Sequence, residues 1–308
     1  MRGIYAAVIT PVEEQGGISV ERLARHCRWL LRQGCHGLAI FGTTSEAQAF
    51  SVDERKAALE ALVAGGIEPD KLAVGTGLCA RTDTVSLTKH ALELGCSNIL
   101  MLPPFFYKNV PDDGVFASFA EVIEAVADPR MALYLYHFPA MSGVPFSKPV
   151  IERLIGAYPK TVVGLKDSSG SWPHAKDLAE SFPDFEIFAG ADTLLLDLLK
   201  AGGSGTISAA ANLNCAANRA VFDAFERGDL AAAETAMPQV AAVRKILEDF
   251  PLIPAIKHVI ADGMDDEVWR TVRPPLVQLA SDVGKDLITK LDAADYAYDP
   301  DLYSVAGA

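Results

Sequence analysis

The chain has 308 residues, enough for one large domain or two of ordinary size, and 50% of them are hydrophobic, so it can bury a sizeable core. Its 27 basic and 40 acidic residues leave a net charge of −13. Because binding to nucleic acid or to an anionic membrane requires a positive surface, we expect neither as a partner.

The cysteines, histidines and apolar segments narrow the class of protein further. The five cysteines are scattered and form no CxxC pair, so we expect neither a disulfide framework nor a structural zinc site. The six histidines show no HxH or HExxH spacing, and no metal is expected. The first residues lack the apolar core of a signal peptide, and no run reaches the length of a membrane span. We therefore expect a reduced, soluble, cytoplasmic protein.

The first two-thirds of the chain repeat one pattern: a short apolar run, a polar turn and an amphipathic helical stretch. The predicted strands are residues 4–10, 37–42, 72–77, 98–103, 131–138, 161–166, 185–190 and 205–209. Near-continuous apolar strands are typical of a parallel sheet that is buried on both faces. Eight such strands, each followed by a helical stretch, predict a (β/α)8 TIM barrel. The alternative, an open doubly wound sheet, lacks the glycine fingerprint that should follow its first strand.

Several residues mark the ends of the predicted helices. Apolar side chains recur at helical spacing within residues 19–34, Ser51 opens the next helix, and Gly95 closes the one after it. After the last strand the chain is helical, with breaks at Gly228 and Pro251.

These breaks divide the chain into two parts. We assign residues 1–225 to the barrel and residues 226–308 to a C-terminal helical extension. The apolar faces of the extension are expected to pack under the barrel or against another subunit. The tail, residues 292–308, is polar and aperiodic, and we expect it to be partly disordered.

The candidate catalytic residues lie at the carboxyl ends of the predicted strands, where barrel enzymes place their chemistry. Lys166 ends the sixth strand, so its side chain can point into a mostly apolar barrel mouth. Burial there disfavours the ammonium and favours a free amine that can attack a carbonyl. A lysine that extends to solvent is the alternative, and position alone does not separate the two.

Two other strand ends add groups that suit this chemistry. Tyr136 lies at the end of the fifth strand, and its phenol can relay the proton that Schiff-base formation and carbon–carbon cleavage require. Thr43 and Thr44 follow the second strand, and their hydroxyls and backbone N–H groups suit a small carboxylate. Taken alone, the tyrosine is more often a core residue and the threonine turn an ordinary helix cap.

Together these segments resemble the dihydrodipicolinate synthase and N-acetylneuraminate lyase family of class I, pyruvate-dependent aldolases. The resemblance runs through the segments AAVITP, FGTTSEA, PPFFYK, LYHFPAMSG, VVGLKDSSG, FAGAD, IPAIKHV and RPPLVQL. It implies that Lys166 forms the Schiff base, that Tyr136 relays protons, and that Thr43 and Thr44 hold the pyruvate carboxylate. It also implies a homotetramer that needs no cofactor and binds pyruvate, or another small 2-oxo acid, together with an aldehyde co-substrate.

The resemblance assigns substrate-binding residues as well, and one of them departs from the family. The backbone at Ile207 would line the pyruvate pocket, and Gly190 and Asp192 would contribute from the end of the seventh strand. Synthases carry an arginine at the position of Met141, where it grips the carboxylate of aspartate semialdehyde. A thioether has no charge and no donor, so aspartate semialdehyde is expected to be a poor substrate. A neutral or hydroxylated aldehyde is expected instead.

Three further departures from the family concern other positions of the predicted site. Neuraminate lyases have a glutamate and a serine where this chain has Thr193 and Ala209, which disfavours a long polyhydroxylated substrate. Phe106 falls where the family lends a tyrosine across a subunit interface, and Tyr107, one residue further on, could restore it. His137 stands in place of the usual asparagine, and we expect it to be structural.

The leading hypothesis is a Schiff-base lyase that cleaves or condenses pyruvate with an aldehyde, acting on a 2-oxo-3-deoxy or 4-hydroxy-2-oxo acid. A 2-oxo acid dehydratase or a 4-hydroxy-tetrahydrodipicolinate synthase would use the same imine. Outside enzymes, a non-catalytic 2-oxo acid sensor would keep the pocket, but it would not need a reactive amine.

Overall fold

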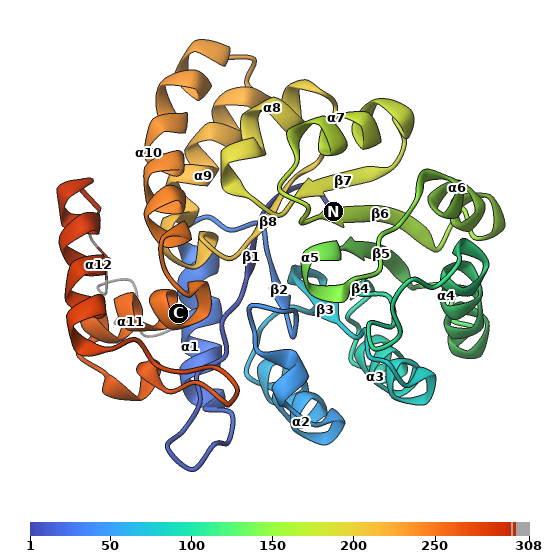
Figure 1. Cartoon of the computed structure of the whole chain (residues 1–308), viewed down its shortest axis with the longest axis horizontal. Helices are drawn as coiled ribbons and strands as arrows, with labels where there is room; N and C mark the ends of the chain where they lie inside the picture. The colour runs from blue at the N-terminus through green and yellow to red at the C-terminus, as the bar shows by residue number, and fades with distance from the viewer. Residues whose placement is uncertain (297, 300–308) are drawn as a thin grey trace.

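The eight strands close into a parallel barrel in chain order, β1 to β8 (Figure 1). The computed structural model describes residues 1–296, 298 and 299. The strands are β1 (Gly3–Ala7), β2 (Gly37–Ile40), β3 (Leu72–Gly75), β4 (Asn98–Met101), β5 (Ala132–His137), β6 (Val162–Asp167), β7 (Glu186–Ala189) and β8 (Gly205–Ser208). Each overlaps the apolar run predicted for it, and the predicted (β/α)8 barrel is confirmed.

The inside of the barrel is filled by side chains rather than left open. Its buried aromatic and aliphatic members include Tyr5, Tyr134, Tyr136, Phe188 and Ile207. Gly164 pairs with Tyr134 across β5 and β6, and a Cβ at Gly164 would lie only 2.5 Å from the tyrosine ring. The missing side chain therefore makes room for the ring, and the packed interior forms a floor beneath the strand ends.

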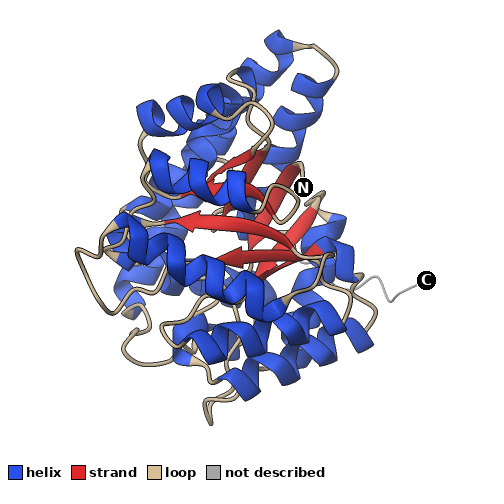
Figure 2. Cartoon of the chain, turned by 90° about the vertical axis from the view of Figure 1, so that its right-hand side faces the viewer, coloured by secondary structure: helices blue, strands red, loops and turns tan. Residues whose placement is uncertain are grey.

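Helices cover the outside of the barrel (Figure 2). They are α1 (Val20–Arg32), α2 (Val52–Ala64), α3 (Arg81–Glu93), α4 (Asp112–Val126), α6 (Lys148–Ala157), α7 (Trp172–Ser181), α8 (Leu195–Lys200) and α9 (Ala211–Glu226). The short α5 (Pro139–Ser142) instead follows the carboxyl end of β5, at the mouth of the barrel. Ser51 caps α2 in a reciprocal capping box with Glu54, as its predicted role requires. Gly95 follows the end of α3 with a φ of 87°, which also agrees with the prediction.

Three helices form the C-terminal extension: α10 (Leu230–Glu248), α11 (Leu252–Met264) and α12 (Ser281–Ala293). Both predicted breaks are confirmed, because Gly228 has a φ of 77° between α9 and α10 and Pro251 precedes α11. Within the described residues, no helix is long and apolar enough to cross a membrane. Of the tail predicted to be partly disordered, residues 297 and 300–308 lie outside the described part of the chain.

The extension packs against the carboxyl end of the barrel. The expectation that it packs under the barrel is wrong, and the alternative, a contact with another subunit, stays a prediction. Ile9 and Ala209, which follow β1 and β8, share a buried cluster with Val243 of α10 and Ile256 of α11. The reason is geometric. Helix α9 leads away from the end of β8, and α10 packs back along α9, so the next turn returns to the barrel mouth (Figure 1).

A disulfide joins Cys35 and Cys215, whose Cα atoms are 5.9 Å apart. The expectation of a fully reduced chain is therefore wrong for this pair. Cys35 follows α1 and Cys215 lies in α9, and these helices cover β1 and β8, which become neighbours only when the barrel closes. A separation of 180 residues gave no local signal for the pairing.

A buried ion pair ties the extension to the loop after β2. Lys257 of α11 and Glu46 form this pair, and their side chains are 0% and 1% exposed. Lys257 also donates to the Thr271 carbonyl at 2.7 Å, and the Arg273 N–H donates to the second carboxylate oxygen of Glu46 at 2.8 Å. Burial lowers the pKa of Lys257, and the charge of Glu46 opposes that shift. Each charge thus has the partners that burial demands.

We predict that Lys257→Met lowers the free energy of unfolding by about 3–5 kcal/mol, because it leaves the Glu46 carboxylate buried without its cation. Urea denaturation monitored by circular dichroism measures the loss. Glu226→Gln is the control, since it removes an exposed ion pair with Arg2 whose side chains are 48% and 41% exposed. Its cost is expected to stay below about 1 kcal/mol. Equal costs for the two variants would contradict the prediction.

Candidate active site

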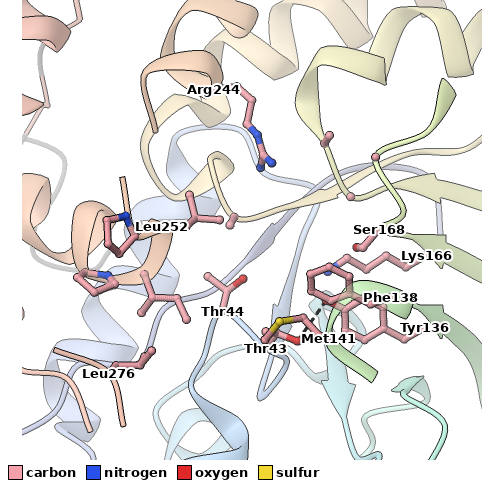
Figure 3. A pocket seen from close by; sticks show the side chains of 17 residues that line it. Thr43, Thr44, Tyr136, Phe138, Met141, Lys166, Ser168, Arg244, Leu252 and Leu276 are labelled. Atoms are coloured by element: carbon pink, nitrogen blue, oxygen red, sulfur yellow. Dashed lines mark hydrogen bonds between the residues drawn. The ribbon is translucent and has the colours of Figure 1, made fainter. Parts of the chain in front are cut away.

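A cavity of about 370 Å³ lies between the strand ends and the C-terminal extension (Figure 3). Its lining from the barrel includes Thr43, Thr44, Tyr136, Lys166, Ser168 and Gly190. Its lining from the extension comprises Arg244, Pro251, Leu252, Ile253, Pro254 and Leu276. The sequence predicted the wall at the strand ends. It did not predict that the extension forms the other wall.

Lys166 enters the cavity from the penultimate position of β6 and is 5% exposed. Its Nζ lies 4.3 Å from the centroid of the Tyr136 ring. The next residue, Asp167, points to the other side of the strand, where it contacts His174. Within the described part of the chain no carboxylate forms an ion pair with Lys166, so its amine is available to a ligand.

Tyr136 and the two threonines meet Lys166 in this cavity. Tyr136 pairs with Lys166 across β5 and β6, and its O–H donates to Thr43 Oγ1 at 3.4 Å. Thr43 and Thr44 both line the cavity from the loop after β2. The sequence thus identified four residues from three strands that the fold brings to one place.

The loop that carries the threonines is held in an unusual shape. Phe41 and Glu46, which flank it, have φ values of 55° and 56°, in the left-handed region that residues other than glycine rarely occupy. Inside the loop the Ser45 hydroxyl donates to the Val8 carbonyl. Together with the Lys257–Glu46 ion pair, these contacts fix the positions of Thr43 and Thr44.

The other predicted substrate-binding residues divide into two groups. Met141 and Gly190 line the cavity, although Met141 is 60% exposed at its edge. Asp192 and Ile207 are fully buried and are not part of the lining. Asp192 begins a short 3-10 turn that directs its carboxylate toward α9, where the Asn218 amide donates to it at 3.2 Å. Burial raises the pKa of this carboxyl group.

Phe106 and Tyr107 lie outside the cavity. Both are exposed, at 73% and 74%, and their rings contact each other edge to face. Neither side chain is part of the cavity lining. A relay role for Tyr107 across a subunit interface stays a prediction.

A cluster of His137, Asp167 and His174 lies behind the strands. The Phe146 N–H donates to His137 Nδ1 at 3.2 Å, burial lowers the pKa of His137 to about 4, and its ring stacks on His174. His137 does not line the cavity, which fits the structural role expected for it. Among the described residues, these three present ligand atoms within 4.8 Å of one another and could hold a metal ion. Hydrogen bonds already occupy an atom of each.

Arg244 is the cavity residue that sequence reasoning missed. It lies near the end of α10, and its side chain enters the cavity from the wall opposite the strand ends (Figure 3). No motif surrounds it, and a lone arginine in a helix is normally a surface residue. Only the return of α10 to the barrel mouth brings it here.

Comparison with known proteins shows to which family the chain belongs. A model of the dihydrodipicolinate synthetase family matches residues 1–294. The chain belongs to this family. An uncharacterized lyase from Chloroflexus aurantiacus is 37% identical over 284 residues, which are 91% of this chain and 93% of that protein.

Two solved structures have the same fold. The dihydrodipicolinate synthase of Agrobacterium tumefaciens is 30% identical, with a TM-score of 0.85 over 96% of this chain and 99% of that one. A prophage protein of the family from Escherichia coli, solved in complex with pyruvate, is 24% identical, with a TM-score of 0.88 over 96% of this chain and 99% of that one. At that identity the second match speaks for the fold alone.

We predict a pH-dependent contribution to stability from His174. Its hydrogen bond with Asp167, 3.0 Å long, raises the pKa of His174 above 6.5. Burial acts to raise the pKa of Asp167, but hydrogen bonds from His174 and the Ser169 N–H hold it below its usual value. Because the folded state favours the protonated imidazole, its contribution is complete below pH 6.5 and is lost as the pH rises through the higher folded value.

The measurement compares wild type with His174→Gln, which cannot titrate. The difference in unfolding free energy between them should shrink as the pH rises from about 6 to about 9, through the raised pKa of His174. Urea titrations at each pH give this difference. A difference that stays constant, or grows with pH, would contradict the assignment.

Proposed function

We propose that this chain is a class I aldolase that cleaves or condenses pyruvate with an aldehyde through an imine on Lys166. The observation that carries the proposal is a buried amine that faces a cavity and has no carboxylate partner among the described residues, next to a tyrosine hydroxyl that is hydrogen-bonded to a threonine. A reactive amine and a positioned acid–base group are the two requirements of this chemistry. Membership of the family supports the same assignment.

The proposed condensation proceeds through an imine on Lys166. The neutral Lys166 amine attacks the carbonyl carbon of pyruvate, and water leaves as the imine forms. Loss of a proton from the methyl carbon gives an enamine, whose carbon forms a bond to the aldehyde carbon while the aldehyde oxygen takes a proton. One water then hydrolyses the imine, which releases the 4-hydroxy-2-oxo acid and restores the amine. Cleavage is the reverse sequence.

Tyr136 is the group we assign to these proton transfers. Its hydroxyl lies in the cavity with Lys166 and contacts Thr43, which can pass a proton on toward solvent. Thr43 and Thr44 are assigned to the pyruvate carboxylate, because a turn with hydroxyls and free N–H groups suits a small anion. Gly190 lines the cavity, and its missing side chain makes room for Ser168.

Two related reactions would use the same imine. A 2-oxo acid dehydratase differs only in its leaving group, and a 4-hydroxy-tetrahydrodipicolinate synthase differs in its aldehyde. The second alternative is supported by the 30% identity to the synthase of Agrobacterium tumefaciens. Met141, at the position of the synthase arginine, favours the general aldolase instead. A sensor without catalysis would leave the Lys166–Tyr136 pair without a purpose.

We extend the proposal to a cytoplasmic homotetramer that needs no cofactor, since the imine itself accepts the electrons of the reaction. The exposed aromatic pair, Phe106 and Tyr107, supports a subunit contact at that loop.

We predict that borohydride and pyruvate together modify one lysine, Lys166, in the wild-type protein. Reduction traps an imine only where a neutral amine meets a bound 2-oxo acid. Peptide mapping by mass spectrometry locates the adduct. Lys166→Met should show no adduct and no turnover, whereas Lys200→Met, at an exposed ion pair with Glu234, should behave as wild type. An adduct on another lysine, or none, would refute the proposed function.

We predict that Tyr136→Phe lowers kcat by about 10²- to 10⁴-fold, as expected for loss of a positioned acid–base group. The ring stays in place, so packing in the barrel interior is preserved. Steady-state release of pyruvate from a 4-hydroxy-2-oxo acid measures the effect, and the midpoint of urea unfolding checks the fold. A loss of less than roughly fivefold would assign the relay to another group.

A further inference from the structure

Arg244 and Lys166 are the two charged residues in the lining of the cavity, among the residues that the structure describes. No aspartate or glutamate lines it. Lys166 is already assigned to the imine in the proposed function, on which this inference rests. Arg244 has no role in that chemistry and therefore requires a separate explanation.

The guanidinium of Arg244 is only partly hydrogen-bonded, although two carboxylates act on it: it forms an ion pair with Glu248 and interacts electrostatically with the buried Asp192, which is not part of the cavity lining. Its side chain is 16% exposed, and its Nε donates to Glu248 Oε1 at 2.8 Å, one helical turn further along α10. Glu248 is 51% exposed and is not part of the cavity lining. Within the described part of the chain, Nη1 and Nη2 have no hydrogen-bond partner. A mostly buried guanidinium with two free nitrogens is a site for an anion.

The wall around Arg244 is apolar. Leu252, Ile253 and Leu276 lie on the same side of the cavity, and Ala191 and Ala209 contribute from the strand ends. None of these side chains can satisfy a hydroxyl group, and a polar group buried without a hydrogen bond is costly. The hydroxyl-bearing side chains of the lining, Thr43, Thr44, Tyr136 and Ser168, lie with Lys166 at the strand ends, so the part of a ligand that contacts the extension is expected to be hydrocarbon up to its anionic end.

The arrangement of the two unbonded nitrogens of Arg244 favours one kind of anion. With Nε occupied by Glu248, Arg244 presents two nitrogens, which match the two oxygens of a carboxylate. A phosphate carries more charge and more oxygens, and the cavity supplies no further cation on this wall. A carboxylate fits the donors that are present.

We propose that Arg244 binds a carboxylate at the far end of the aldehyde, so that the substrate is a 4-hydroxy-2-oxo acid with a second carboxylate and an apolar middle. This revises the expectation of a neutral or hydroxylated aldehyde, which considered Met141 alone. The cation that is missing at Met141 is supplied from α10, on a different wall of the cavity (Figure 3).

The experiment compares two aldehydes of the same size in condensation with pyruvate. Succinic semialdehyde ends in a carboxylate, and 4-methylpentanal ends in an isopropyl group of similar shape. Wild type should prefer succinic semialdehyde by at least about tenfold in kcat/KM. Arg244→Met should reduce this preference roughly 10- to 100-fold, and Arg244→Lys, which keeps the charge without the paired donors, should fall between.

Lys245→Met is the matched control, because Lys245 neighbours Arg244 on α10, carries the same charge, is exposed and does not line the cavity. It should leave the preference unchanged. A wild-type preference for 4-methylpentanal, or an equal loss for both aldehydes in Arg244→Met, would overturn the proposal. A stronger dependence on Arg244 with glyceraldehyde 3-phosphate than with succinic semialdehyde would overturn the choice of a carboxylate.

Borohydride trapping of pyruvate separates the two levels of inference. If wild type forms the Lys166 adduct but shows no preference for the carboxylate, this proposal fails while the proposed function stands. If wild type forms no adduct, the proposed function fails, and the assignment of Arg244 fails with it.

Discussion

The buried ion pair between Lys257 and Glu46 is the constraint on which the site depends. Glu46 ends the loop that carries Thr43 and Thr44, and Lys257 lies in α11 of the extension, so one interaction joins both walls of the cavity. Two charges this deeply buried are tolerated only when they are paired and fully hydrogen-bonded, as Thr271 and the Arg273 N–H ensure. The extension is thus part of the active-site architecture and not an appendage.

The two walls of the cavity carry different functions. The strand ends hold Lys166 and Tyr136, the groups proposed for the imine chemistry, on a parallel sheet whose interior is packed beneath them. The extension supplies Arg244, for which we propose a role in the choice of aldehyde and not in bond making.

The outer face of β6, the strand that carries Lys166, is bonded to helix α7. Because side chains alternate along β6, Lys166 faces the cavity while Asp167 faces α7 and bonds to His174. Hydrogen bonds hold the pKa of Asp167 low in spite of burial, so a fixed negative charge stays on the far side of the strand. The amine is left to the cavity, with the Tyr136 ring as its neighbour.

The sequence by itself determined the barrel and the reactive cluster, since apolar runs and strand ends are local signals and a closed parallel sheet brings all its carboxyl ends to one edge. Lys166, Tyr136, Thr43 and Thr44 could be predicted for that reason. Only the tertiary structure decided the rest. Arg244 reaches the cavity because α10 packs back along α9, Cys35 meets Cys215 because β8 closes on β1, and Asp192 turns away because a short helical turn follows β7. Each of these depends on contacts between segments distant in sequence, or on a turn whose direction local spacing does not encode.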